Sequence, residues 1–366
     1  MRIIVFGLTI TSSWGNGHAT LWRGLVRALT HAGCRVGFFE RDVPYYAGSR
    51  DLTEIPGGDL FLYGDWEDVR ERARRELAVA DVVIVTSYCP DAIAATELIA
   101  EEQPPVSVFY DMDTPVTLSR LAQGEDTGYI GPRGLRDFDL VLSFTGGGAL
   151  TELRERLGAR RVAPFYGHVD PDVHRPTGAA EHYRADLSYL GTYARDRQAA
   201  LEALFLTPAS RCPERRFLIG GAQYPPDFPW YPNLYFVHHL PPSEHPAFFS
   251  SSRLTLNITR AAMRTMGWCP SGRLFEAAAC GVPVISDTWD GIETFYAPGR
   301  EVLLVDTAED VLRALELDDA QLGRIGTAAR ERTLAEHTSA HRARELMALL
   351  EDDARGVRAN VEVRHV

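Results

Sequence analysis

The sequence has few cysteines, and none of them stands in a C-x-x-C pair or at a spacing typical of a zinc site. The five, an odd number, are Cys34, Cys89, Cys212, Cys269 and Cys280. This usage excludes a disulfide scaffold and predicts free thiols in a reducing compartment. We therefore expect a cytoplasmic protein.

Positive charge and long apolar runs are also scarce. Lys and Arg number 38 against 50 Asp and Glu, a formal net charge of -12, which is the wrong sign for a surface that coats nucleic acid. Apolar runs such as residues 3–10 and 82–85 fall far short of the roughly 18 to 20 residues that span a bilayer. We expect neither a nucleic-acid partner nor a transmembrane segment. Because the first apolar run leads directly into a glycine loop, we expect no signal peptide.

What the chain does have is length and a repeating α/β pattern. Its 366 residues predict about two domains, and 45% apolar with 24% charged residues is typical of a globular protein. Short runs that are apolar throughout alternate with helical patterns, as in parallel sheets with helices on both faces. The strands expected in the first half are 3–7, 36–40, 59–63, 82–86, 106–110, 140–144 and 161–165.

Glycine and proline interrupt this pattern after residue 166, and it then starts again. The later strands are expected at 187–191, 216–219, 234–237, 254–258, 282–286 and 302–305. We expect an α/β fold of two doubly wound parallel sheets: a Rossmann-like domain at 1–166, a linker at 167–182, a second Rossmann-like domain at 183–335, and a closing helix with a tail at 336–366. Ligands bind beyond the carboxyl ends of parallel strands, so two facing sheets would form an interdomain cleft.

The loop at residues 11–18 follows the first expected strand and opens a helix. Gly15 and Gly17 permit a close backbone approach, and the start of the helix offers unpaired N–H groups to a phosphate, a sugar hydroxyl or an oxyanion. His18 could act as a general base or be a structural histidine. The spacing does not match G-x-G-x-x-G, so no dinucleotide fingerprint is present.

Two carboxylates, Asp111 and Asp113, follow the strand expected at 106–110. A D-x-D motif could bind a divalent metal with phosphates, although the same pattern is common at turns and helix caps. Asp113 could instead orient His18 or act directly as an acid or base. The sequence leaves these alternatives open, and metal binding is the weaker one.

In the second half, Arg195 follows the first strand and could clamp a pyrophosphate, or be a solvated side chain. An alanine-rich helix follows Ser271 and Gly272, and Glu276 is its only charge after Arg273. A buried carboxylate needs hydrogen-bond donors, and a ribose diol supplies two. The amino end of the same helix suits a phosphate.

Residues 273–286 (RLFEAAACGVPVIS), followed by DGIE at 290–293, resemble the donor-binding half of GT-B glycosyltransferases of the group 1 type. The segments GNGHATL at 15–21, YDMDTPVTL at 110–118 and GHVDP at 167–171 resemble the CgeB-like branch, named for a spore-maturation protein. The resemblance covers most of residues 1–350. It implies the GT-B fold, with a closing helix that crosses back to the first domain.

The resemblance also implies an activity, the transfer of a sugar from a nucleoside diphosphate donor to an acceptor that is a saccharide, a protein or a small molecule. Glu276 would hold the ribose, and Glu293 would lie near the donor sugar. GT-B enzymes usually need no metal, so we expect neither a metal nor another cofactor. The donor-binding candidates are Gly17, Arg195, His239, Leu240, Ser271, Gly272, Arg273, Leu274 and Glu276.

One position departs from the family pattern. Retaining members often carry a second glutamate eight residues before the one that binds ribose, and this chain has Trp268 there. That favours an inverting reaction, with His18 as base and Asp113 and Glu293 as further catalytic candidates. The alternatives are a sugar-nucleotide epimerase or hydrolase of the same fold, and a nucleotide-sugar-binding protein without catalysis. The sequence does not indicate an oligomeric state.

Overall fold

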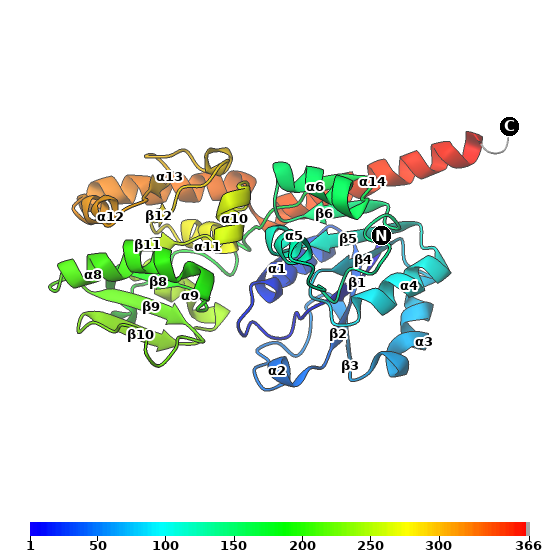
Figure 1. Ribbon diagram of the computed structural model, residues 1–366, viewed down its shortest axis with the longest axis horizontal. Coiled ribbons are helices and arrows are strands. Elements are labelled where there is room, and N and C mark those ends of the chain that lie inside the picture. The colour runs from blue at the N-terminus through cyan, green and yellow to red at the C-terminus, as the bar shows by residue number, and fades with distance from the viewer. Residues whose placement is uncertain (364–366) are drawn as a thin grey trace. The chain divides into compact units, whose positions relative to one another are not determined.

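The computed structural model describes residues 1–363 (Figure 1). The polypeptide divides into two compact units. Unit 1 comprises Met1–Ser13, His18–Tyr166 and the segment from Ser339 onward; unit 2 comprises Trp14–Gly17 and Gly167–Thr338. The end of the predicted tail, residues 364–366, lies outside the described residues.

Unit 1 is built on a parallel sheet of seven strands in the order β3-β2-β1-β4-β5-β6-β7. The chain therefore winds outward from β1 in one direction and then, from β4 on, in the other, which is the doubly wound pattern. The strands are β1 (Arg2–Gly7), β2 (Arg35–Arg41), β3 (Gly58–Tyr63), β4 (Val82–Thr86), β5 (Val106–Asp111), β6 (Leu140–Ser143) and β7 (Val162–Pro164).

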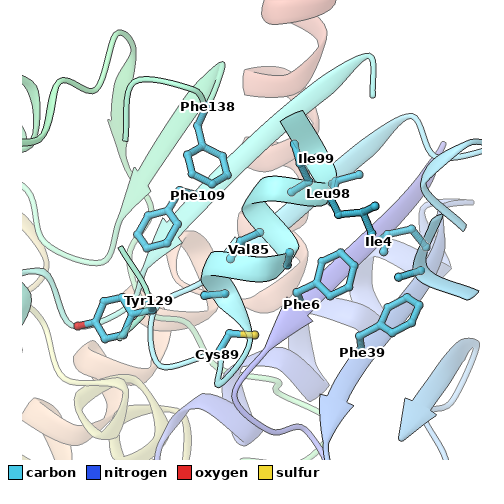
Figure 2. Packing of buried hydrophobic residues seen from close by; sticks show 14 of the residues in the cluster. Ile4, Phe6, Phe39, Val85, Cys89, Leu98, Ile99, Phe109, Tyr129 and Phe138 are labelled. Atoms are coloured by element: carbon cyan, nitrogen blue, oxygen red, sulfur yellow. The ribbon is translucent and has the colours of Figure 1, made fainter. Parts of the chain in front are cut away.

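Helices cover both faces of this sheet because successive strand residues point to opposite sides. On one face, Ile4 and Phe6 of β1 pack with Leu98 of α4, and Figure 2 shows these side chains around that helix. On the other face, Trp22 of α1 meets the ring of Phe38 edge-on at 5.6 Å. The helices of the unit are α1 (His18–His31), α2 (Pro44–Ala47), α3 (Trp66–Leu77), α4 (Ala92–Glu102), α5 (Thr114–Ala122), α6 (Gly148–Leu157) and α14 (Ser339–Val363).

The last helix, α14, completes the core of unit 1. Leu346 is fully buried, and Met347 lies with its sulfur 3.9 Å from that of Cys34, just before β2. The guanidinium of Arg342 donates to the carbonyl of Tyr166 over 3.2 Å. Unit 1 is therefore assembled from the two ends of the chain.

Unit 2 contains a parallel sheet of six strands in the order β10-β9-β8-β11-β12-β13. Counted from its own first strand, this order repeats that of the first six strands of unit 1, so the prediction of a doubly wound parallel sheet in each half is confirmed. The strands are β8 (Ala185–Leu190), β9 (Phe217–Gly221), β10 (Leu234–His238), β11 (Ser252–Asn257), β12 (Val284–Ser286) and β13 (Leu303–Leu304).

The helices of unit 2 are α7 (Gln198–Leu201), α8 (Thr207–Arg211), α9 (His245–Ser250), α10 (Ala261–Met266), α11 (Gly272–Ala279), α12 (Ala308–Leu315) and α13 (Asp319–Glu336). Between α7 and α8 the backbone forms a π-helical turn at Glu202–Leu206, so the three segments make one continuous helical stretch that ends at Arg211. Pro208 explains the wider turn, because proline lacks the N–H that would bond to the carbonyl four residues back.

Helices α11 and α13 approach each other closely. A Cβ atom on Gly326 of α13 would stand 2.3 Å from the carbonyl oxygen of Gly281, the turn that follows α11. One turn further along, Arg330 donates to the carbonyl of Ala279 over 3.1 Å. These contacts fix α11, which carries Glu276. None of the described helices is both long and apolar enough to cross a membrane.

Candidate functional site

His18 and Asp113 lie together in unit 1. His18 is the first residue of α1, and Asp113 stands between β5 and α5, so both follow carboxyl ends of parallel strands. The His18 Nε2 is 2.9 Å from Oδ2 of Asp113. The histidine is 8% exposed, and its Nδ1 has no hydrogen-bond partner. The pairing leaves Nδ1, which is itself buried, as the ring nitrogen without a hydrogen-bond partner.

Asp113 occupies the N-cap position of α5, where an aspartate usually accepts a hydrogen bond from the helix. Here the side chain makes no such bond. Its carboxylate is instead committed to His18, which orients the imidazole.

The other carboxylate of the D-x-D motif, Asp111, is completely buried. Its Oδ1 accepts from the N–H of Asp113 at 3.0 Å and from the hydroxyl of Thr117 at 3.1 Å. Burial raises the pKa of Asp111 to about 7. The carboxylates of the two aspartates thus bind different groups. In the described part of the chain, the only cluster of three potential metal ligands does not include either aspartate.

A buried glutamate, Glu40 at the end of strand β2, holds the loop that leads to His18. Its carboxylate accepts from the N–H groups of Ile10 and Thr11 at 2.7 and 3.0 Å and from the Thr9 hydroxyl at 2.9 Å. These bonds fix the loop between β1 and α1. Gly17, in the same loop, has open space where a Cβ would stand, so no described neighbour requires glycine there.

Tyr88, which the sequence analysis did not single out, is part of this site. Its ring meets that of His18 edge-on with centroids 6.0 Å apart, and it lies 5.1 Å from the ring of Tyr129. The backbone of Tyr88 has a φ of 61°, a conformation uncommon for a bulky residue and typical of functional sites. Its position just beyond strand β4 is the one signal that could have identified it.

In unit 2, Glu276 lies on α11 and is 8% exposed. Each of its carboxylate oxygens faces a different imidazole: Oε1 is 4.0 Å from Nε2 of His174, and Oε2 is 3.7 Å from Nδ1 of His245. Burial opposes ionisation of Glu276, but the two histidines and Arg273 together lower its pKa to about 2. The sequence prediction of a buried glutamate is therefore correct, and the two histidines were missed.

The start of α11 gathers positive charge. The Ser271 hydroxyl caps the helix by accepting a hydrogen bond from the N–H of Arg273 at 3.3 Å. Gly272 is the first residue of the helix, and Leu274 is buried. Burial and the neighbouring Arg197 lower the pKa of the Arg273 guanidinium. Among the described residues, the Nε of Arg197 is buried without a hydrogen-bond partner, and its Nη1 donates only to the carbonyl of Thr192, over 3.4 Å. Such a pair suits an anionic ligand.

The structure separates the two arginines that follow strand β8. Arg195 is exposed in a short 3-10 turn at Arg195–Arg197. Arg197, two residues later, is half-buried and near Arg273. The residue singled out from the sequence thus lies at the surface, and its neighbour lies with the helix start.

The segment after strand β10 joins the same site. His239 has a φ of 48° and donates its N–H to the carbonyl of Gly221 over 2.7 Å. Leu240 is buried, and its carbonyl is 3.3 Å from Nε2 of His245. The segment that carries the donor-binding candidates His239 and Leu240 is therefore connected through His245 to Glu276.

Glu293 and Trp268 lie apart from these contacts. Glu293 is exposed and, within the described part of the chain, forms no side-chain hydrogen bond or ion pair. Trp268 has a φ of 44° and donates its N–H to the carbonyl of Asp290 over 2.6 Å. A Cβ on Gly291 would stand 2.5 Å from the indole ring. The tryptophan thus fills the position of the second glutamate and packs on the DGIE turn.

Comparisons with known proteins agree with this architecture. Residues 197–348 match the model of the glycosyl transferase-like family. Among solved structures, sucrose-phosphate synthase from Thermosynechococcus elongatus superposes with a TM-score of 0.70 at 16% identity, over 96% of this chain and 98% of that one. The fold is GT-B-like.

Two further solved structures are similar over nearly their whole length. The Anabaena protein HepE, in complex with UDP and glucose, has a TM-score of 0.68 at 11% identity, covering 96% of this chain and 100% of that one. An alpha-glucosyltransferase in complex with UDP-glucose and DNA has a TM-score of 0.70 at 12% identity, covering 96% and 99%. No curated protein matches the sequence.

Proposed function

We propose that this chain is a glycosyltransferase that moves a hexose from a UDP-sugar to an acceptor hydroxyl. The observation that carries the proposal is the buried, ionised Glu276 on a helix whose first turn carries Arg273 with Arg197 nearby. The match of residues 197–348 to the glycosyl transferase-like family supports it. The choice of uridine follows the UDP and UDP-glucose bound in two of the similar structures.

Unit 2 would hold the donor. The carboxylate of Glu276 would accept hydrogen bonds from the two ribose hydroxyls, which replaces the hydration lost on burial. Arg197, Arg273 and the first N–H groups of α11 would bind the diphosphate. His239 and Leu240 would border the base. The donor's diphosphate would then meet positive charge without a metal ion, because Arg273 lies in the first turn of α11 and Arg197 is close enough to act on it electrostatically.

Unit 1 would supply the base. Asp113 would keep a proton on Nε2 of His18. Nδ1, which is buried in this structure, would become accessible when the acceptor binds and take the proton of its hydroxyl as the oxygen attacks the anomeric carbon. The bond from that carbon to the diphosphate oxygen breaks, and UDP leaves with the electron pair. Attack opposite the leaving group inverts the anomeric configuration. Trp268, in place of a second glutamate, is consistent with this route. Assignment to the CgeB-like branch remains a prediction.

Ligand-induced thermal stabilisation tests the donor site, since a ligand that binds the folded state raises the melting midpoint. UDP, GDP, dTDP, CMP and NAD are compared on the wild type, on Glu276→Gln and on Glu301→Gln. Glu301 is a matched control, because it is a buried glutamate of unit 2 that accepts from the N–H of Ala297. We expect UDP to stabilise the wild type and the control but not Glu276→Gln. Stabilisation by NAD alone would refute the proposal.

Incubation with UDP-glucose distinguishes the reactions. Transfer yields UDP and a glycosylated acceptor, an epimerase yields a different UDP-sugar, and a hydrolase yields free glucose. Binding of UDP without any of these products, with and without a panel of acceptors, would identify a binding protein.

A further inference from the structure

We infer that His174, His245 and Glu276 of unit 2 form a binding site for a transition-metal dication of the zinc type. The three residues come from distant segments: the stretch before β8, the start of α9 and the middle of α11. One potential ligand atom from each lies within 4.8 Å of the others. The ion takes no part in the proposed transfer.

The hydrogen-bonding state of the histidines is the first observation. His174 is 1% exposed, and neither of its ring nitrogens has a hydrogen-bond partner. Burial of an imidazole whose nitrogens form no hydrogen bonds costs free energy. A ligand bound to one of these nitrogens would offset that cost. Its Nε2 is directed toward Glu276, at 4.0 Å from Oε1.

The tautomer of His245 is the second observation. Its Nε2 is 3.3 Å from the carbonyl oxygen of Leu240, which can only accept, so the neutral ring carries its proton on Nε2. Nδ1 therefore presents a lone pair, and it is 3.7 Å from Oε2 of Glu276. In that neutral form Nδ1 and the carboxylate oxygen are both electron-pair donors, and they are too far apart for a hydrogen bond. A cation bound between them would be coordinated by both.

The donor set selects the type of ion. Two imidazoles and one carboxylate suit zinc and its neighbours, whereas Mg²⁺ and Ca²⁺ prefer oxygen ligands. Ligand atoms around tetrahedral zinc stand about 3.3 Å apart at bond lengths of about 2.0 Å. The three ligand atoms here lie within 4.8 Å of one another, so side-chain rotations that draw all three together would close the site. Arg273 near Glu276 opposes added positive charge, and we expect a micromolar rather than a tighter affinity.

Binding of an ion at this site would affect nucleotide binding, an inference that rests on the proposed function. If Glu276 holds the ribose of the donor, the same carboxylate cannot hold an ion at the same time. The ion would therefore act as an inhibitor that competes with the nucleotide.

Titration of the metal-stripped chain with Co²⁺, in the absence of nucleotide, tests the site, because four-coordinate Co²⁺ gives visible absorption bands. We expect about one equivalent to bind to the wild type. His174→Ala and His245→Ala should each weaken binding about 100-fold or more, since even loss of an outer-shell partner costs about 10- to 100-fold. His182→Ala is the matched control, an exposed histidine of the same unit, and should bind like the wild type.

Absence of saturable Co²⁺ binding, or equal loss in the control, would overturn the inference. X-ray absorption of the zinc-loaded wild type needs no variant and covers the case in which His174→Ala fails to fold. It should show nitrogen and oxygen neighbours near 2.0 Å with imidazole scattering. Sulfur at about 2.3 Å would assign the metal to a cysteine such as Cys280 and refute the site. Because UDP is absent, failure here leaves the donor proposal untouched.

Discussion

The carboxylate of Asp113 holds His18, at 2.9 Å between Oδ2 and Nε2, instead of capping the helix that follows it. An aspartate at an N-cap typically contributes about 1 kcal/mol to helix stability. In this chain that contribution is given up, and the imidazole gains a fixed orientation. A bond that serves orientation at the expense of local stability is typical of a reactive site.

Loss of this pair should lower the turnover of the proposed glycosyl transfer. We expect His18→Ala to reduce kcat by about 10²- to 10⁴-fold, the usual contribution of a general base, and Asp113→Asn by a smaller factor. Release of UDP from UDP-glucose in the presence of an active acceptor measures both. His31→Ala, at the exposed far end of α1, serves as control. Full activity of His18→Ala with intact UDP binding would remove His18 from the reaction.

The two arginines after strand β8 should differ in their effect on diphosphate binding. Arg197 lies near Arg273, whereas Arg195 is exposed. We expect Arg197→Gln to weaken UDP binding by about 10-fold or more, since a hydrogen bond to a charged group contributes about 1.5 to 3 kcal/mol. Calorimetric titration with UDP and with uridine separates the diphosphate from the nucleoside. Uridine affinity should be unchanged, and Arg195→Gln should match the wild type; the reverse order would favour Arg195.

Two glycines of α13 should respond oppositely to alanine. A Cβ on Gly326 meets the carbonyl oxygen of Gly281 at 2.3 Å, so Gly326→Ala should destabilise the fold by about 1 to 3 kcal/mol. Gly323, one turn earlier, has nothing within 4 Å, and alanine there should stabilise the helix by about 0.5 to 1 kcal/mol. Urea unfolding of both variants measures the difference. Equal effects would contradict the close approach of α11 and α13.

The buried Asp111 should give the protein a pH dependence of stability. Burial raises its pKa from 3.8 to about 7, so between these values the folded state binds more protons than the unfolded state. Its contribution to stability is therefore fully present below about pH 4 and is lost as the pH rises toward 7, by at most about 1.4 kcal/mol per pH unit. Asp111→Asn removes the effect. Urea unfolding from pH 5 to 8 should show the variant gaining relative to the wild type; a constant difference would contradict the raised pKa.

Much of the fold could be predicted from the sequence, because the strands of a doubly wound sheet are buried on both faces and appear as continuous apolar runs. Residues 82–86, for example, form β4 over the expected range. Short helices such as α9 and α10 were not predicted, since six residues give too little periodicity. The π-helical turn before Pro208 also leaves no clear pattern in the sequence.

The candidate site could be predicted where one segment of the sequence carries all of its residues. Glu276 could be found because its helix contains no other charge after Arg273, and His18 because it follows a glycine loop. His174 and His245 could not, because only tertiary folding brings them to Glu276. The choice between Arg195 and Arg197 depends on which side chain points toward the interior. A loop has no regular repeat from which that direction could be predicted.

The discontinuity of unit 1 has a consequence for synthesis of the chain. Leu346 and Leu350 of α14 are buried with less than 3% exposed, so the core of the first sheet lacks one covering helix until the last part of the chain has been made. During synthesis, the apolar surface that α14 covers in the complete chain stays exposed on the N-terminal half until unit 2 has been translated. Premature termination after residue 338 would therefore release a fragment in which the first half, rather than the truncated end, is the part prone to aggregate.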